Sequence, residues 1–250
     1  MTPNPILKVL STLAAYQVRY LLMGGQACVL YGAAEFSRDT DVVVLAEAEN
    51  LDRLARALGE LQAECVAVPP FAPEYLQRGH AVHFRCRHPE ASGMRVDVMA
   101  VLRGVAPFEE LWQRRTTLEV EPGAFLEVLA LPDLVQAKKT QRDKDWPMIR
   151  RLVEAHYAQN RANPNPEQVQ FWLRESRTPA MLRELAARYP DQLAGILSQR
   201  PLLTLAAAGD EPGLAAALEA EEKQEREADR LYWLPLRKEL EDLRHQRRNP

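Results

Sequence analysis

Two aspartates, Asp39 and Asp41, stand two positions apart at the start of an apolar run, residues 42–45. Side chains at positions i and i+2 of a strand point to the same face, so we expect both carboxylates to converge on one place. Carboxylates held this close repel each other unless a cation or a proton lies between them. Mg²⁺ takes such oxygen ligands and keeps water ligands that phosphate oxygens can replace. The pair therefore indicates a divalent-cation site; the alternative is two acidic side chains that face solvent.

A third acid, Asp97, interrupts the apolar residues of segment 94–101, which alternates as a strand does. Alternation places it on the same face as Arg95. A carboxylate in mid-strand is costly to bury without a partner. Asp97 is therefore expected either to form a salt bridge, with Arg95 or Arg85, or to join the aspartate pair as a third ligand.

Two glycines, Gly24 and Gly25, end the strand-like segment 16–23 and precede a short apolar helical segment, 26–31. A glycine turn that enters a helix exposes backbone N–H groups, and the helix dipole adds positive potential there. Glycine also lets a ligand approach the backbone closely. The turn is therefore expected to bind a phosphate near the aspartate pair.

The elements that must position these residues alternate between strand and helix up to about residue 160. Strand patterns lie at 16–23, 42–45, 80–87, 94–101, 116–120 and 125–131, and helical patterns at 5–15, 51–62 and 108–115. Asn50 is expected to be the N-cap of the helix at 51–62, and the strands at 80–87 and 94–101 to be an antiparallel pair. A helix, a charged turn and a second helix are expected from residue 131, and NPNP at 163–166 is the linker candidate. We therefore predict an α/β (α+β) domain at residues 1–160 and an all-helical C-terminal region at residues 165–250.

Composition predicts an ordinary cytoplasmic protein. Apolar residues make up 46% and charged residues 27%, and the net charge of −3 argues against wholesale wrapping by nucleic acid. The three cysteines lack CxxC spacing, which predicts reduced thiols rather than a disulfide framework or a zinc knuckle. No stretch reaches the roughly 18 apolar residues of a membrane span, so no membrane partner is expected.

The pattern GG-x-A-x(3)-YG, followed by S-R-D-x-D, an apolar strand and a lone Asp in a later strand, resembles the polymerase-β-like nucleotidyltransferase superfamily. Within it, the likeness is to bacterial AbiEii-type toxins and minimal nucleotidyltransferases, and it covers about residues 16–155. It implies a nucleotidyltransferase fold with a mixed β-sheet flanked by helices, two Mg²⁺ ions and a nucleoside triphosphate such as ATP. It also implies transfer of a nucleotidyl group to a hydroxyl acceptor on RNA, protein or a small molecule, and an antitoxin partner if the chain is a toxin.

The resemblance assigns roles to individual residues. Asp39 and Asp41 match the ligands of both metals, and Asp97 matches the third acid, a metal ligand able to deprotonate the acceptor hydroxyl. The residues that it implies for substrate binding are Gly24, Gly25, Ser37, Arg38, Lys138 and Lys144. Lys138 matches the lysine of a D-L-[IV]-x-x-K helix near the triphosphate, whereas Arg142, Lys144 and Asp145 match a basic and acidic turn more loosely. The alternative for Lys138, Lys144 and Asp145 is a charged helix end with mixed ion pairs.

Two features depart from the family pattern. Many relatives carry Arg where Glu35 stands, so Glu35 is expected to pair elsewhere, with Arg38 as its nearest candidate. Better-known members have Gly-Ser in the first turn, so backbone amides alone must serve the phosphate at Gly24-Gly25. A second hypothesis is therefore a catalytically inactive domain of the same fold that binds nucleotide or a partner protein.

Three histidines, His80, His83 and His88, cluster before the third acid. His80 and His83 fall on opposite faces of the predicted strand, which argues against a zinc site. A structural or substrate-lining role is expected for them.

Overall fold

The computed structural model describes residues 4–121 and 123–248. The chain divides into two compact units. The first comprises Met1–Leu30, Ala34–Ala137 and Tyr232–Pro250, and the second comprises Tyr31–Ala33 and Lys138–Leu231. The boundary predicted near residues 160–165 lies inside the second unit.

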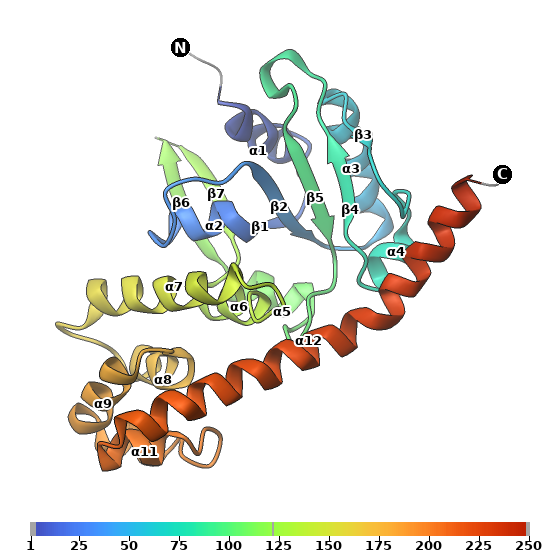
Figure 1. Ribbon diagram of the computed structural model, residues 1–250. Helices are drawn as coiled ribbons and strands as arrows, with labels where there is room; N and C mark the ends of the chain where they lie inside the picture. Colours follow the sequence, from blue (N-terminus) through green and yellow to red (C-terminus); the bar gives the residue numbers. More distant parts are fainter. Residues whose placement is uncertain (1–3, 122, 249–250) are drawn as a thin grey trace. The chain divides into compact units, whose positions relative to one another are not determined.

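A seven-stranded mixed sheet forms the centre of the first unit (Figure 1). Its strands are β1 (Tyr20–Met23), β2 (Asp39–Val44), β3 (Glu64–Cys65), β4 (Val82–Arg85), β5 (Arg95–Met99), β6 (Thr116–Glu121) and β7 (Ala124–Val128). Their spatial order is β3-β4-β5-β2-β1-β7-β6. The pairs β2/β5 and β1/β7 are parallel and the other neighbours are antiparallel, including the predicted β4/β5 pair.

Short and medium-length helices accompany this sheet. They are α1 (Pro5–Ala15), α2 (Gly24–Leu30), α3 (Ala48–Glu60), α4 (Pro73–Gln77), the 3₁₀ turn η1 (Pro89–Ala91), α5 (Phe108–Gln113) and α6 (Leu131–Ala137). The start of α1 follows from the sequence, because the Asn4 side chain accepts hydrogen bonds from the backbone N–H groups of Ile6 and Leu7, and Pro5 takes the first helical position. The fold is thus mixed α/β, as predicted.

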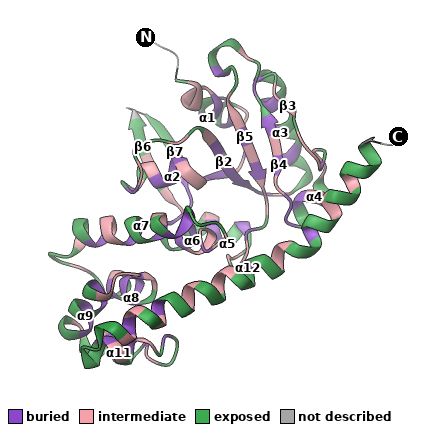
Figure 2. Cartoon of the chain, viewed as in Figure 1, coloured by how far each residue is buried: buried purple, intermediate pink, exposed green. Residues whose placement is uncertain are grey.

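The central strands carry the apolar core of this unit. Val42, Val43 and Val44 are fully buried in β2, and Val96 and Val98 are fully buried in β5. Figure 2 shows β2 largely in the colour of buried residues, whereas β5 alternates between buried and intermediate residues. β2 begins at Asp39, earlier than the predicted residue 42, so the aspartate pair lies inside the strand.

The predicted role of Asn50 as an N-cap is wrong. Helix α3 begins at Ala48 with Glu47 at the cap position, and Asn50 lies buried within its first turn. The Asn50 side chain accepts a hydrogen bond from the Arg19 backbone N–H at 2.7 Å. It also donates to the carbonyls of Arg19 at 3.0 Å and Leu45 at 2.9 Å. This amide satisfies backbone groups beside β1 and β2, which outweighs a single capping bond.

The second unit is helical. It contains α7 (Asp145–Asn160), α8 (Pro166–Glu175), α9 (Pro179–Arg188), α10 (Pro190–Ala194), α11 (Leu203–Ala208) and the part of α12 (Glu211–Arg248) up to Leu231. The NPNP segment ends at a helix start, because Asn165 and Gln168 form a capping box and Pro166 follows the cap. Trp172 is fully buried and packs edge-on against Tyr157, with ring centroids 4.9 Å apart.

A buried arginine ties the C-terminal end of α8 to α12 within this unit. Arg200 donates hydrogen bonds to the carbonyls of Leu173 and Ser176 and forms an ion pair with Glu221 at 2.8 Å. Arg200 therefore satisfies both the helix-end carbonyls and the half-buried carboxylate of Glu221. Over residues 4–121 and 123–248, no helix has the combined length and apolar character that a membrane crossing requires.

Candidate functional site

Two parallel strands bring the three predicted acids together on one sheet face. In the register of β2 and β5, Asp39 is opposite Arg95 and Asp41 is opposite Asp97. In both strands these polar residues are partly exposed and alternate with buried ones. The next strand, β4, places His83 directly opposite Asp97. The predicted convergence of Asp39, Asp41 and Asp97 on one face is therefore present.

Asp97 is held by two cationic or polar side chains. Its Oδ1 lies 2.8 Å from the Nε of Arg95 and 2.8 Å from the Nδ1 of His83. A nitrogen this close to a carboxylate oxygen carries a hydrogen, so His83 Nδ1 donates to Asp97 and cannot also accept from Arg95 Nη2, 3.2 Å away. Among the described residues, Asp97 Oδ2 has no hydrogen-bond partner.

These contacts shift the ionisation of the pair. Burial on its own would raise the pKa of Asp97, but the hydrogen bonds and charges of His83 and Arg95 outweigh it and lower the pKa. The hydrogen bond to Asp97 raises the pKa of Arg95 against the opposing effect of burial, and the charges of Asp97, Asp39 and Asp41 add to the rise. Arg95 is therefore the ion-pair partner of Asp97, and the charges of Asp39 and Asp41 favour its charged form.

Gly24 and Gly25 pack tightly against Asp41 and Ser37. Gly24 has φ +66°, and a Cβ atom built on it would lie 2.0 Å from Oδ2 of Asp41. A Cβ on Gly25 would lie 2.3 Å from Oγ of Ser37. The Gly25 backbone N–H, assigned to a phosphate from the sequence, points at Asp41 Oδ2 at 3.4 Å. Both positions therefore require glycine, because the turn between β1 and α2 lies very close to Ser37 and Asp41.

The segment before β2 differs in one respect from the prediction. Ser37 is half-buried, and Gln26 donates a hydrogen bond to its carbonyl at 2.9 Å. Arg38 is exposed, and its guanidinium lies 5.7 Å from the ring centroid of Phe36. The expected Glu35–Arg38 ion pair is wrong: within the described part of the chain Glu35 is exposed and forms no salt bridge, because water solvates its charge and Arg38 stacks on Phe36 instead.

The two predicted lysines belong to the second unit. Lys138 Nζ lies 3.2 Å from Oδ1 of the buried Asp145, while Thr140 Oγ1 and Arg142 Nε lie 2.6 and 2.7 Å from its Oδ2. Lys144 is exposed and immediately precedes α7. Burial alone would raise the pKa of Asp145, but the charges of Lys138 and Arg142 and the Thr140 hydrogen bond lower it. The ion pairs that were the alternative to a substrate-binding role are therefore present for Lys138 and Asp145.

We expect Asp145→Asn to lower the free energy of unfolding by roughly 2–3 kcal/mol at pH 7, because it removes a buried carboxylate from the partly buried Lys138 and Thr140 and the exposed Arg142. A lowered folded-state pKa stabilises the protein above the carboxyl's ordinary range near pH 4, and this contribution is lost as pH falls through the folded-state pKa. The difference between variant and wild type should thus shrink below about pH 4 in urea denaturation. Asp143→Asn, at a side chain that is 96% exposed, is the control; an equal loss there contradicts the prediction.

The acidic face, formed by Asp39, Asp41 and Asp97, offers oxygen ligands of the kind that a divalent cation takes. Over residues 4–121 and 123–248, no group of three or more His, Cys, Asp or Glu side chains is arranged to hold a metal ion. The donor chemistry still suits a hard divalent cation: Asp39, Asp41 and the unpartnered Oδ2 of Asp97 offer carboxylate oxygens on one face, and Arg95 already supplies a positive charge among them. The residues fit Mg²⁺ in ligand type, with Arg95 standing in for a cation.

Sequence reasoning missed the part played by Arg95 and His83 as joint partners of Asp97. Alternation placed Arg95 beside Asp97, and a salt bridge was one alternative. The His83 contact depends on the register of β4 against β5, which pairs His83 with Asp97. The local sequence of 80–87 does not determine that register.

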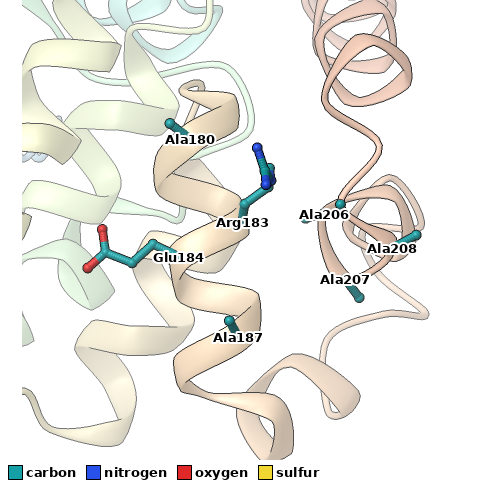
Figure 3. Close-up of a pocket in the computed structure, with 8 residues that line it drawn as sticks. Ala180, Arg183, Glu184, Ala187, Ala206, Ala207 and Ala208 are labelled. Carbon is teal, nitrogen blue, oxygen red and sulfur yellow. The ribbon is translucent and has the colours of Figure 1, made fainter.

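A groove of about 470 Å³ lies in the second unit (Figure 3). Its walls are mostly alanines of α9 and α11, together with Arg183 and Glu184. Both charged side chains already have partners. Arg183 donates a hydrogen bond to Glu211, and Glu184 accepts one from the Tyr157 hydroxyl. The groove thus lacks the converging reactive groups that the acidic face of the sheet carries.

Comparisons with known proteins assign no family. No protein-family model matches the chain, and no curated protein matches it. The acids on β2 and β5 are therefore the features of this chain that point to a function.

Proposed function

We propose that this chain is a Mg²⁺-dependent nucleotidyltransferase with the corresponding fold, which moves a nucleotidyl group from a nucleoside triphosphate to a hydroxyl acceptor. One observation carries the proposal: Asp39, Asp41 and Asp97 share one face of two parallel strands, with Asp41 and Asp97 in direct register. The glycine turn packs against Asp41 at the same place. Carboxylates beside a glycine turn suit the binding of a nucleotide's phosphates together with a divalent cation.

The proposed reaction is a displacement at the α-phosphorus. The acceptor oxygen forms a bond to that phosphorus, the bond to the α–β bridging oxygen breaks, and pyrophosphate leaves. Mg²⁺ held by Asp39 and Asp41 would supply charge neutralisation on the phosphate oxygens. Asp97 is ionised at neutral pH because its pKa is lowered. Its Oδ2, which makes no hydrogen bond within the described residues, would receive the hydroxyl proton.

The remaining predicted residues fit supporting roles in this proposal. Gly24 and Gly25 would approach the phosphates, and Ser37 and Arg38 border the same segment. Lys138 and Lys144 belong to the second unit, and their triphosphate contact stays a prediction of the family resemblance. The acceptor is a hydroxyl on RNA, protein or a small molecule, and a toxin role with an antitoxin partner is part of the same proposal.

The proposal is tested by label transfer from each nucleoside triphosphate carrying ³²P at the α-phosphate, with Mg²⁺ and a cell extract as the source of acceptors. We expect label to become attached to one acceptor class, and nuclease or protease treatment identifies that class. Label at the γ-phosphate should not transfer, because it leaves with pyrophosphate. Transfer of the γ-label, or no transfer and no nucleotide binding by calorimetry, overturns the proposal.

A catalytically inactive nucleotide-binding or protein-interaction domain is the second candidate. One observation favours it: Arg95 and His83 already occupy Oδ1 of Asp97. The family resemblance also implies an arginine where Glu35 stands. Nucleotide binding without label transfer to any acceptor would support this second function.

A further inference from the structure

Two arginines, Arg85 and Arg95, stand directly opposite each other on the antiparallel strands β4 and β5. Directly opposed residues share one face of a sheet, with Cβ atoms about 5 Å apart, and like charges in such a pair destabilise it. Arg85 is exposed, and the side chain of Arg95 is 41% exposed. The sheet therefore carries two adjacent positive charges on the face that also carries Asp97.

Arg85 has no protein group that neutralises it. Over residues 4–121 and 123–248, its side chain makes no hydrogen bond, ion pair or ring contact. Glu64 stands opposite Arg85 on β3, but its carboxylate instead accepts hydrogen bonds from Arg87, through Nε at 3.1 Å and Nη2 at 2.9 Å. The guanidinium of Arg85 is therefore available to a ligand.

Arg95 also keeps donors free for a ligand. It donates to Asp97 through Nε alone. Its Nη1 makes no hydrogen bond within the described part of the chain, and its Nη2 lies 3.2 Å from Nδ1 of His83, which donates to Asp97 and cannot accept. The terminal N–H groups of two neighbouring guanidinium groups can therefore converge on one anion.

The two arginines lie across the acids from the glycine turn. In the strand order β4-β5-β2-β1, the acid-bearing strands β5 and β2 separate Arg85 on β4 from Gly24, which follows β1. Three strand spacings of about 4.8 Å place β4 and β1 about 14 Å apart. An anion at the arginines would therefore be separate from a phosphate bound at the glycine turn.

We propose that Arg85 and Arg95 bind a phosphate group of the acceptor, which is therefore an oligonucleotide rather than a protein side chain. This inference rests on the proposed function, because it identifies the acceptor of that reaction. Guanidinium groups match phosphate oxygens in charge and geometry, and a bound phosphate offsets the repulsion between the two cations. Because Arg95 contacts Asp97, the phosphate would lie near the carboxylate that receives the hydroxyl proton. An oligonucleotide presents a ribose hydroxyl beside a phosphate.

The test is fluorescence anisotropy of a short, fluorescein-labelled, single-stranded oligoadenylate RNA titrated with the full chain, without nucleoside triphosphate or divalent cation. We expect Arg85→Gln to raise the Kd about tenfold, because it removes charge-assisted hydrogen bonds to a phosphate. The slope of log Kd against log salt concentration should fall in magnitude by about 0.7, since one phosphate contact fewer releases fewer counterions. Arg85→Lys keeps the charge and should retain the wild-type slope.

Arg56→Gln is the matched control, because Arg56 is an exposed arginine of α3 without an ion pair in the described ranges. We expect its Kd to change by less than about twofold, since a distant surface charge is screened. The melting temperature of Arg85→Gln should not fall below that of the wild type, because a repulsive pair is removed. The inference is overturned if the wild type does not bind the oligoadenylate, if Arg85→Gln binds it equally well, or if Arg56→Gln loses as much affinity.

ATP binding with Mg²⁺, measured by calorimetry, assigns the phosphate to its source. We expect Arg85→Gln to change the Kd for ATP by less than about twofold, because the glycine turn lies beyond the screening length from Arg85. Loss of ATP binding in place of oligoadenylate binding would assign the arginines to the triphosphate and overturn the inference.

Failure of this inference is distinguishable from failure of the proposed function, because the anisotropy assay needs no nucleotidyl transfer. Oligoadenylate binding that depends on Arg85, without label transfer to any acceptor, would uphold the phosphate site and overturn the enzyme. Label transfer to protein, with oligoadenylate binding unaffected by Arg85→Gln, would uphold the enzyme and overturn this acceptor.

Discussion

Asp39→Asn should reduce nucleotidyl transfer by at least about 10³-fold, which corresponds to about 4 kcal/mol of transition-state stabilisation. The amide keeps the size of the carboxylate but removes the negative charge that a divalent cation requires. Asp39 is the acid least engaged by protein groups: its carboxylate makes no hydrogen bond within the described residues, and its charge contributes to the raised pKa of Arg95. The loss should therefore appear in activity rather than in folding.

Thermal unfolding separates these two effects. We expect the melting temperature of Asp39→Asn to equal or exceed that of the wild type, since removing one of several adjacent carboxylates relieves repulsion. Asp52→Asn, the same substitution at an exposed position of α3, should leave both label transfer and melting unchanged. Full activity of Asp39→Asn, or an equal loss in Asp52→Asn, would count against a catalytic role for the acidic face.

The sequence predicts the bounds of a helix or strand correctly where residues adjacent in the chain determine them. Helix α1 has its predicted bounds because Asn4 and Pro5 set its start. β1 is shorter than predicted, because Gln17 adopts φ +54° and the strand begins only at Tyr20. The start of α3 was mispredicted because the buried amide of Asn50 satisfies the distant backbone of Arg19. That contact depends on tertiary packing, which a capping pattern cannot reveal.

The candidate site shows the same limit. The i, i+2 rule was enough to place Asp39 and Asp41 on one face. Their proximity to Asp97 depends on the parallel pairing of β2 with β5, which joins segments distant in sequence. The sequence also led to the wrong partner for Arg38, because an exposed ring at Phe36 competes with Glu35 for the guanidinium. Long-range register and competition between partners are not encoded in a short motif.

We expect Gly24→Ala to lower both the free energy of unfolding and the activity. Two causes contribute: backbone strain, and a collision with the Asp41 side chain. A residue with a Cβ atom at φ +66° is strained by about 1 kcal/mol, and the Cβ atom would lie 2.0 Å from Asp41 Oδ2, so that carboxylate must move. We expect the free energy of unfolding to fall by roughly 2–4 kcal/mol from strain plus overpacking. Label transfer should fall by about 10²-fold, because a shift of about 1 Å in a positioning group has that effect.

Gly93→Ala isolates the first cause. Gly93 has φ +77°, and nothing lies within 4 Å of a Cβ atom built on it, so the variant carries the backbone strain without the collision. We expect it to lose only about 1 kcal/mol in urea denaturation and to keep wild-type label transfer. If Gly24→Ala and Gly93→Ala lose the same stability and activity, the close approach of Gly24 to Asp41 has no role in holding that carboxylate. If only Gly24→Ala loses label transfer, the first glycine acts by fixing the position of an acidic ligand, in addition to any phosphate that it binds.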